Sequence, residues 1–419
     1  MKRESIPTVV QQHAQDAASL RNARTSLVRA PHVKLNQLRR LDDRLAAHLD
    51  GLEVAGEYGS QLATAALESP GRGEVFTAAV RAIEGRDPAG LDRVIALVQA
   101  LPDSPSGLMS AFGWVSAASL RGITSALLAS PDPFRRRIGI AACAMHGVDP
   151  GDALVAAAGD DEAALRARAL RAMASSGRVE HLAACVRALA DVDAHCAFEA
   201  ARAAVLLGER QHAPSVLHRL ASTAGPWRAA ALGLLLRLSE AAEAHAALKP
   251  LSQQPADARL LIRGMGMAGD ARYVPWLIQQ MQDAKLARLA GESFSLITGL
   301  DLAGLNLDGA RPDTPEGGPS DDPDAGDVAM DEDEGLPWPG AGKIGAWWQA
   351  HGQRLAEGVR LFMGEPPSVA HCRPVLRTGF QRQRTAAAEW LCLLQPGTPL
   401  FNTAAPAWRQ QRWLTQMGV

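Results

Sequence analysis

The sequence is poor in aromatic residues, lysine and disulfide-type cysteine patterns. Aromatic residues make up 5% of the 419 positions, and the apolar content of 47% is mostly Ala and Leu. This composition favours closely packed helices over strands. The five cysteines are odd in number and show no C-x-x-C spacing. We therefore expect reduced, buried thiols in a reducing compartment instead of a disulfide framework.

Long apolar runs and catalytic patterns are missing as well. No stretch approaches the roughly 18 uninterrupted apolar residues that span a bilayer, and the first thirty residues contain no signal-peptide core. These features predict a cytoplasmic protein that does not insert into a membrane. No Ser or Cys nucleophile has a patterned base, and neither paired carboxylates nor metal-protease spacing occurs. We predict that the chain is not an enzyme and uses no cofactor or metal.

What the sequence does contain is a repeat of about thirty residues. Small residues end one helix and begin the next at separations of 30 or 31 residues. They are Gly147, Gly177, Gly208, Ser239, Gly269 and Gly299. Such a period is typical of solenoids, in which each unit buries its apolar face against its neighbours. In the unit after Gly177, the spacing of Val179, Leu182, Val186 and Leu189 predicts one buried stripe, and Leu217 continues it in the next unit.

Charge and composition divide the chain into five predicted segments. Residues 308–335 hold eleven acids against Arg311 alone, so the remainder of the chain carries a formal charge of +8. High charge without apolar content predicts disorder, and a solvated linker is the favoured interpretation. The alternatives are an interaction tail for a basic partner and an internal mimic that covers the protein's own basic surface. The segments are a weakly ordered stretch at 1–30, a helical region at 31–130, an all-α solenoid at 131–306, an acidic disordered insertion at 307–342, and a Trp-rich helical cap at 343–419.

Several strings of the sequence resemble a known family. The layout of helix pairs is similar to the short HEAT-like repeats of phycobilisome lyases. Six strings carry a closer resemblance: AFGWVS at 111–116, RRIGIAACAMHGVDPG at 136–151, FEAARAAVLLGER at 198–210, ESFSLITGLDL at 292–302, GFQRQRTAAAEWLCLL at 379–394 and PLFNTAAPAWRQQRWL at 399–414. They are similar to a family of bacterial HEAT-repeat proteins that are commonly encoded beside type VI secretion genes. The resemblance implies an adaptor or chaperone that handles a secretion effector or spike component, and it supplies no catalytic residues.

Trp and Arg provide the candidate residues for binding a protein partner, because these residue types dominate interface energies. The candidates are Arg136, Arg168, Arg382, Arg384, Trp408, Arg409, Arg412 and Trp413. Capping of the solenoid end is the favoured interpretation of the C-terminal residues as a group, with single surface residues left for binding, and Trp390 fits a core position better. Arginines at 135–137 and at 166, 168 and 171 form a ridge that could grip phosphates. Ion pairs between adjacent units explain this ridge more simply, so nucleic-acid binding is the less favoured hypothesis.

Two further patterns resemble cofactor sites only loosely. The string at 340–344 lacks the leading Gly and the Ser or Thr of a phosphate loop and follows no strand. His181, Cys185, His195 and Cys196 have donor types that suit zinc, but ordinary packing is the favoured explanation because cysteine is among the most buried residue types. An enzyme or toxin that uses the C-terminal lobe is the alternative from a different class. The sequence leaves the partner, the binding face and the oligomeric state open.

Overall fold

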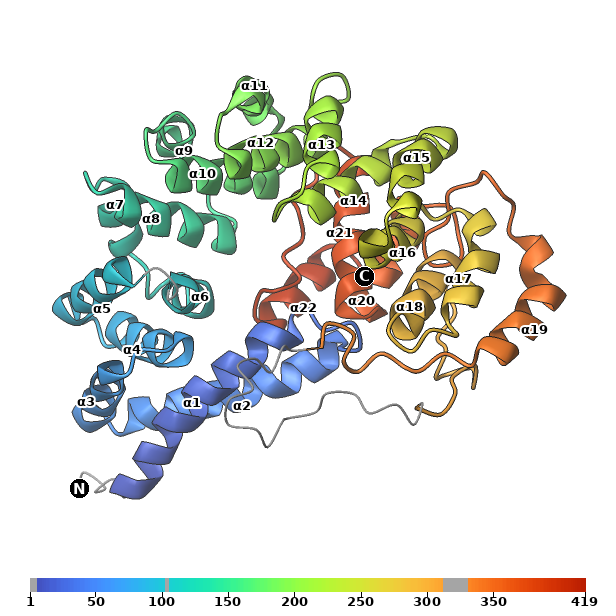
Figure 1. Ribbon diagram of the computed structural model, residues 1–419. Helices are drawn as coiled ribbons and strands as arrows, with labels where there is room; N and C mark the ends of the chain where they lie inside the picture. The colour runs from blue at the N-terminus through green and yellow to red at the C-terminus, as the bar shows by residue number, and fades with distance from the viewer. Residues whose placement is uncertain (1–5, 102–104, 312–330) are drawn as a thin grey trace. The chain divides into compact units, whose positions relative to one another are not determined.

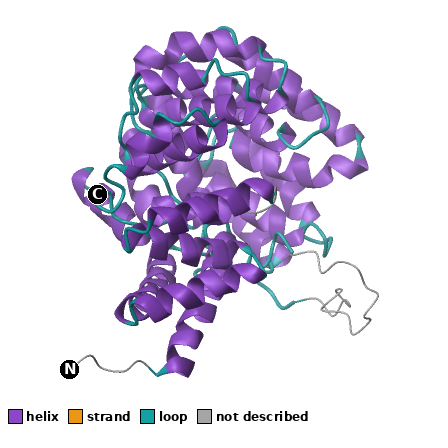
Figure 2. Cartoon of the chain, turned by 90° about the vertical axis from the view of Figure 1, so that its left-hand side faces the viewer, coloured by secondary structure: helices purple, strands orange, loops and turns teal. Residues whose placement is uncertain are grey.

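The computed structural model describes residues 6–101, 105–311 and 331–419 (Figure 1). Within these residues the regular elements are helices, and no strand is formed (Figure 2). This confirms the all-α class, and the sequential packing of neighbouring helices is consistent with a helical repeat array. None of the described helices is both long and apolar enough to cross a membrane. Unit 1 comprises Met1–Arg29, Val33–Glu209 and Arg377–Val419, and unit 2 comprises Ala30–His32 and Arg210–Leu376.

Unit 1 contains a row of stacked helices that begins in the N-terminal part of the chain. Two helices from the C-terminal part pack against helices of this unit. Its helices are α1 (Pro7–Leu27), α2 (Leu35–Val54), α3 (Glu57–Ala65), α4 (Arg72–Glu84), α5 (Pro88–Ala100), α6 (Pro105–Trp114), α7 (Ile123–Leu128), α8 (Pro133–His146), α9 (Asp152–Ala157), α10 (Ala163–Ser176), α11 (Leu182–Arg187), α12 (Ala194–Leu206), α21 (Gln381–Leu394) and α22 (Ala407–Gln416). Helices α1, α4, α6, α8, α10 and α12 pack successively side by side. Helix α22 packs on α2, and α21 packs on α12. Residues 7–27, for which the sequence predicted only weak order, form the first helix of this row.

Unit 2 continues the pattern of packed helix pairs. Its helices are α13 (Ala213–Ser222), α14 (Arg228–Leu238), α15 (Ala241–Leu248), α16 (Ala258–Ala268), α17 (Val274–Gln280), α18 (Ala287–Thr298), α19 (Ala341–His351) and most of α20 (Val369–Thr378). Helices α14, α16 and α18 pack in succession, and α17 lies against α18 and α19. Of the predicted acidic insertion at 307–342, residues 312–330 lie outside the described residues, whereas 331–333 form ion pairs with arginines of α16 and α18.

The turn residues of the repeat have a conformational reason. Gly147, Gly177, Gly269 and Gly299 end α8, α10, α16 and α18 with φ between 68° and 76°. A side chain is strained in this left-handed region, so glycine is the residue that ends a helix there most readily. The regular spacing of these residues in the sequence therefore follows the regular lengths of the helices.

The buried stripe predicted for the unit after Gly177 is only partly correct. Leu189 is buried, but Val179 is 53% exposed and Leu182 is half-buried. Cys185 occupies the fully buried position instead. Residues Val179–His181 form a tight 3₁₀ turn before α11 begins, so the α-helical spacing assumed for the stripe does not hold across it. In the next unit, Leu217 is fully buried as expected.

This difference leads to a stability prediction. We expect Leu217→Ala to lower the free energy of unfolding by about 2–5 kcal/mol, because it leaves a cavity at a fully buried position. Leu182→Ala should cost clearly less, because Leu182 is half-buried. Urea unfolding of both variants, followed by circular dichroism, measures the two losses. Equal losses would contradict the assigned burial.

Candidate binding pocket

The position of α22 depends on a buried carboxylate of α2. Asp42 is fully buried and forms an ion pair with Arg24 of α1 at 2.7 Å between Oδ1 and Nε. Its Oδ2 accepts a hydrogen bond of 2.7 Å from the backbone N–H of Ala407, the first residue of α22. Arg24 also donates to the carbonyl oxygens of Ala404 and Ala405 at 2.9 and 3.0 Å. A negative charge is favourable at a helix N-terminus, so this group of contacts holds the start of α22 against α1 and α2.

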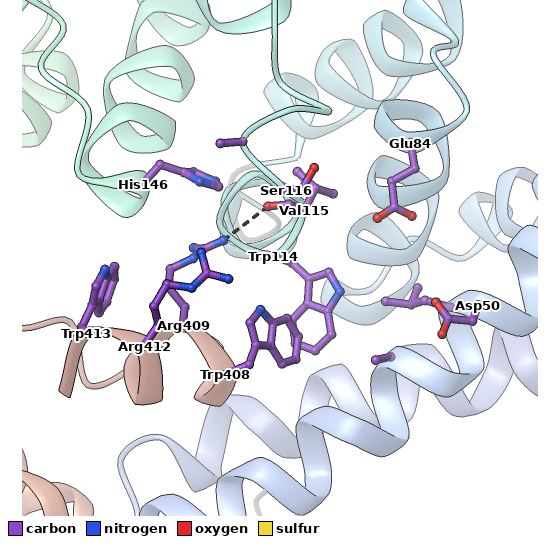
Figure 3. A pocket seen from close by; sticks show the side chains of 13 residues that line it. Asp50, Glu84, Trp114, Val115, Ser116, His146, Trp408, Arg409, Arg412 and Trp413 are labelled. Atoms are coloured by element: carbon purple, nitrogen blue, oxygen red, sulfur yellow. Dashed lines mark hydrogen bonds between the residues drawn. The ribbon is translucent and has the colours of Figure 1, made fainter. Parts of the chain in front are cut away.

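Helix α22 forms one wall of a cavity of about 420 Å³ in unit 1 (Figure 3). This volume is in the range of pockets that bind small ligands or inserted side chains. The other walls come from α2, α4, the end of α6 with the residues after it, and the end of α8. The lining residues are Ala46, Leu49, Asp50, Glu84, Trp114, Val115, Ser116, Ala117, His146, Trp408, Arg409, Arg412 and Trp413. Four of the eight residues proposed from the sequence therefore meet in this pocket.

Aromatic rings make up the apolar part of the pocket. The rings of Trp114 and Trp408 are perpendicular, with centroids 4.6 Å apart, and Phe76 packs edge-on against Trp114 from the core. Trp413 is held in the same way by Phe401, with centroids 5.7 Å apart. Edge-to-face pairs are favourable because the positive ring edge meets the negative ring face. The aromatic surfaces are thus fixed before any ligand binds.

Arg409 joins the pocket to the ends of two helices. Its Nη1 donates to the carbonyl oxygens of Gly113 and Met145 at 2.7 and 3.4 Å, and its Nη2 donates to Val115 at 3.3 Å. Carbonyl groups at helix C-termini carry partial negative charge and lack partners within the helix, so a guanidinium satisfies them well. Burial, and then the charge of Arg412, lower the pKa of Arg409 to about 10, which leaves it positively charged at neutral pH.

His146, at the end of α8, uses one ring nitrogen for a hydrogen bond to the backbone. Its Nε2 lies 2.8 Å from the carbonyl oxygen of Phe112, which requires a proton on this nitrogen. Burial lowers its pKa, the hydrogen bond to Phe112 opposes this shift, and the nearby charge of Arg409 lowers the pKa further. Ser116 is hydrogen-bonded to Ser119 at 2.9 Å. The pocket therefore offers hydrogen bonds and charge, and its serine and histidine are not arranged as a nucleophile and base.

The charges that remain available in the pocket are separated by sign. Arg412 is exposed and has no hydrogen bond or ion pair with any residue that the structure describes. Asp50 and Glu84 lie on another wall, from α2 and α4 (Figure 3). Burial raises the pKa of Glu84, although Arg81, 3.6 Å away, opposes that shift. A ligand that carries a negative group toward Arg412 and a positive group toward Asp50 would suit this arrangement.

Two candidates on α21 have structural contacts. Arg384 is fully buried, where it donates to the side-chain oxygens of Gln381 and Gln410, the latter at 2.6 Å. Burial lowers its pKa to about 10. Arg382 donates from Nε to the carbonyl oxygen of Arg29 at 3.4 Å. The structure thus places Arg384 in the interior and Arg382 next to the residues that follow α1. Neither residue lines the pocket. Trp390, interpreted as core, is buried.

The arginine ridge predicted along 135–137 and 166–171 divides into paired and unpaired members. Arg136 pairs with Asp160 at 2.6 Å and Arg166 pairs with Asp191 at 2.8 Å. In unit 2, Arg228 and Asp257 form the corresponding pair at 2.6 Å. Each of these arginines reaches an aspartate near the start of a following helix, as expected for ion pairs between adjacent repeats. Arg135 also pairs, with Asp92 at 2.8 Å, whereas Arg137, Arg168 and Arg171 form no such close pair.

The other cofactor-like patterns hold no assembled site. Within the described residues, no group of three or more His, Cys, Asp or Glu side chains is placed to hold a metal ion. Burial raises the pKa of both Cys185 and Cys196 to about 12, so these thiols stay protonated at neutral pH. In the string at 340–344, Lys343 Nζ donates to the carbonyl oxygens of Asn306 and Asp308 at 3.1 and 2.8 Å.

Sequence patterns did not identify the acidic wall of the pocket. Asp50, Glu84 and His146 come from helix ends that are far apart in the chain, and no local motif relates them. Trp114 lies within the string AFGWVS, which was the one available signal. No protein-family model, no curated protein and no solved structure matches this chain.

Proposed function

We propose that this chain is a non-enzymatic helical-repeat scaffold of the HEAT-like type, and that the pocket beside α22 binds a segment of a protein partner. The observation that supports this most is the meeting of Trp408, Trp413 and Arg412 at one cavity, with Arg412 exposed and unpaired among the described residues. Trp and Arg are the residues that contribute most to binding when they lie at a partly enclosed surface. The aromatic rings are already held in place, so little conformational freedom is lost on binding.

The charge pattern favours recognition of a polypeptide. A peptide segment can present an apolar side chain to Trp114 and Trp408 while a neighbouring acidic residue reaches Arg412. A basic residue of the same segment can reach Asp50 on the other wall. Extended repeat surfaces commonly bind proteins through such distributed contacts. The arrangement of Ser116 and His146 supports binding over catalysis by an enzyme or toxin, because each is committed to another hydrogen bond.

The resemblance to proteins encoded beside type VI secretion genes supports the biological setting of the proposal. In that setting the partner would be a secretion effector or a spike component, and the scaffold would act as an adaptor or chaperone. This part of the proposal rests on the resemblance alone, since a fold by itself does not determine a function.

A retention experiment tests the pocket. Effector and spike components of the host's type VI system are expressed singly and passed over the immobilised full-length protein. We expect one component to be retained, with affinity lowered tenfold or more by Arg412→Gln with Trp413→Ala, because these changes remove one cation and one aromatic contact. Arg121→Gln, at an exposed position outside the pocket lining, serves as the matched control. Retention that is equal in the pocket variant and the control would contradict the proposal, as would retention of no component.

A further inference from the structure

Four arginines of unit 1 gather on three successive helices of the row. They are Arg137 on α8, Arg168 and Arg171 on α10, and Arg202 on α12. Burial, and then the positive charge of Arg171, lower the pKa of Arg168 to about 10, and Arg137 acts in the same direction. Burial also lowers the pKa of Arg171, with a contribution from Arg202, although the Arg171 side chain is 56% exposed. The four side chains, here called the arginine cluster, therefore lie close enough to repel one another, and that of Arg171 is exposed to solvent while the other three are partly buried.

The arginine cluster carries more positive charge than its neighbours balance. The buried carboxylate of Glu199 lies 3.5 Å from Arg202 and 3.9 Å from Arg171, so two arginines share it. Glu162 acts on Arg137 only at longer range. The Arg168 side chain has no hydrogen bond or ion pair with any residue that the structure describes, and Glu199 acts on it only at longer range. The Nε of Arg137 is buried without a hydrogen-bond partner. Guanidinium groups without a close acidic partner are suited to bind carboxylates or phosphates.

In unit 2, arginines on two successive helices of the row bind acidic residues of the same chain. Arg263 of α16 pairs with Glu332 at 2.6 Å, and Arg259 of the same helix pairs with Asp333 at 2.8 Å. Arg288 of α18 pairs with Asp331. Three consecutive acidic residues are thus bound across two adjacent helices. Asp333 is only 2% exposed, so it is packed closely against these helices and does not interact with them through long-range electrostatics alone.

The positions of these arginines in the repeat correspond between the two units. Arg171, Arg202 and Arg263 each lie six residues before the glycine that follows their helix, and Arg137 and Arg259 each lie ten residues before it. The reference glycines are Gly147, Gly177, Gly208 and Gly269. Equivalent positions in stacked repeats face the same way relative to their own unit. Arg171 and Arg202 therefore share the repeat position of Arg263, and Arg137 shares that of Arg259, whereas Arg168 and Arg288 have no counterpart at these two positions. Unlike the arginines of α16 and α18, the arginine cluster has no three consecutive acidic residues bound to it among the described residues.

We propose that the arginine cluster binds an acidic segment of a protein partner in the manner in which α16 and α18 hold Asp331–Asp333. This rests on the proposed function as a protein-binding scaffold and adds the chemistry of one partner segment. Nucleic acid fits less well, because phosphate binding usually draws on a longer row of free cations. Here Arg135, Arg136 and Arg166 of the same ridge are already paired.

The test uses the full-length protein and a fluorescein-labelled hexapeptide Asp-Glu-Asp-Glu-Gly-Leu, which has the sequence of residues 331–336. The chain's own segment is tethered to unit 2, so a free peptide competes poorly there and reports on other sites. Fluorescence anisotropy should show binding that weakens as salt is added, and no binding of the peptide with Asn and Gln in place of Asp and Glu. Arg168→Gln with Arg171→Gln should lower the affinity roughly tenfold or more.

The control variant is Arg93→Gln with Arg135→Gln, which removes the same charge outside the arginine cluster and should leave the affinity unchanged. Circular dichroism confirms that both variants keep their helices. Equal affinity in the cluster variant and the control overturns the proposal, as does absence of peptide binding. Duplex DNA that binds more tightly than the peptide and is lost in the cluster variant also overturns it, in favour of nucleic acid. Arg412→Gln with Trp413→Ala should not affect the peptide, so failure here and failure of the pocket proposal are separate results.

Discussion

Asp42→Asn is expected to lower the free energy of unfolding by about 3–5 kcal/mol, which is the cost of breaking a buried ion pair from one side. Asparagine keeps the shape of aspartate but removes the charge that balances Arg24, whose side chain is itself largely buried. The contact with the N-terminus of α22 weakens as well, because the N–H of Ala407 then meets a neutral amide oxygen at best. Urea unfolding followed by tryptophan fluorescence measures the loss, since Trp114 and Trp408 lie next to this region.

The adjacent residue supplies the control for this prediction. Asp43 also pairs with an arginine, Arg39, one helical turn away, but its side chain is 54% exposed. Exposed ion pairs contribute little to stability. The free energy of unfolding of Asp43→Asn should therefore lie within about 0.5 kcal/mol of the wild-type value. Similar losses for the two variants would show that the Arg24–Asp42 pair does not hold α22. If the pair does hold it, Asp42→Asn should also weaken partner retention at the pocket, because α22 supplies Trp408 and Arg412.

Gly73→Ala should destabilise unit 1 by about 3 kcal/mol or more. A methyl group at this position of α4 would lie 2.2 Å from the carbonyl oxygen of Ala18 and 2.7 Å from its Cα. Both are backbone atoms of α1, so no side chain can rotate away and the two helices must separate. Packed interiors accommodate such displacement poorly, and here the added volume lies in the contact between α1 and α4. Thermal unfolding followed by circular dichroism at a helical wavelength reports the change.

Gly342→Ala is the matched control. Gly342, like Gly73, is the second residue of its helix, but nothing lies within 4 Å of the position where its Cβ would stand. Alanine restricts the unfolded chain more than glycine does, so stability should be unchanged or raised by up to about 1 kcal/mol. A loss in Gly342→Ala as large as that in Gly73→Ala would mean that close packing against α1 does not explain the effect at Gly73.

Local patterns in the sequence were sufficient for the class and the repeat. The glycines at 147, 177, 269 and 299 mark helix ends because only their left-handed backbone allows the turn without strain. Ala-rich stretches between them predict close helix packing, and the structure places their helices side by side. The same patterns failed at Val179, where a 3₁₀ turn changes which residues face the core. Periodicity assumes a constant number of residues per turn, so it cannot anticipate such a change.

Composition alone also indicated that Trp408, Arg409, Arg412 and Trp413 were unusual, since aromatic residues are scarce elsewhere in the chain. It could not show that Arg384 is buried among glutamines while Arg412 is exposed without a side-chain partner among the described residues, because identical side chains differ only in what surrounds them.

The sequence by itself determined the helical class, the thirty-residue period and the types of residue available for binding. Each of these depends on local backbone preference or on the spacing of apolar residues along one helix. Only the tertiary structure decided that Arg24 and Asp42 hold the start of α22, and that Asp50, Glu84 and Trp114 complete its pocket. The tertiary structure alone decided which arginines form ion pairs, because ion pairing depends on distances between residues that lie far apart along the chain.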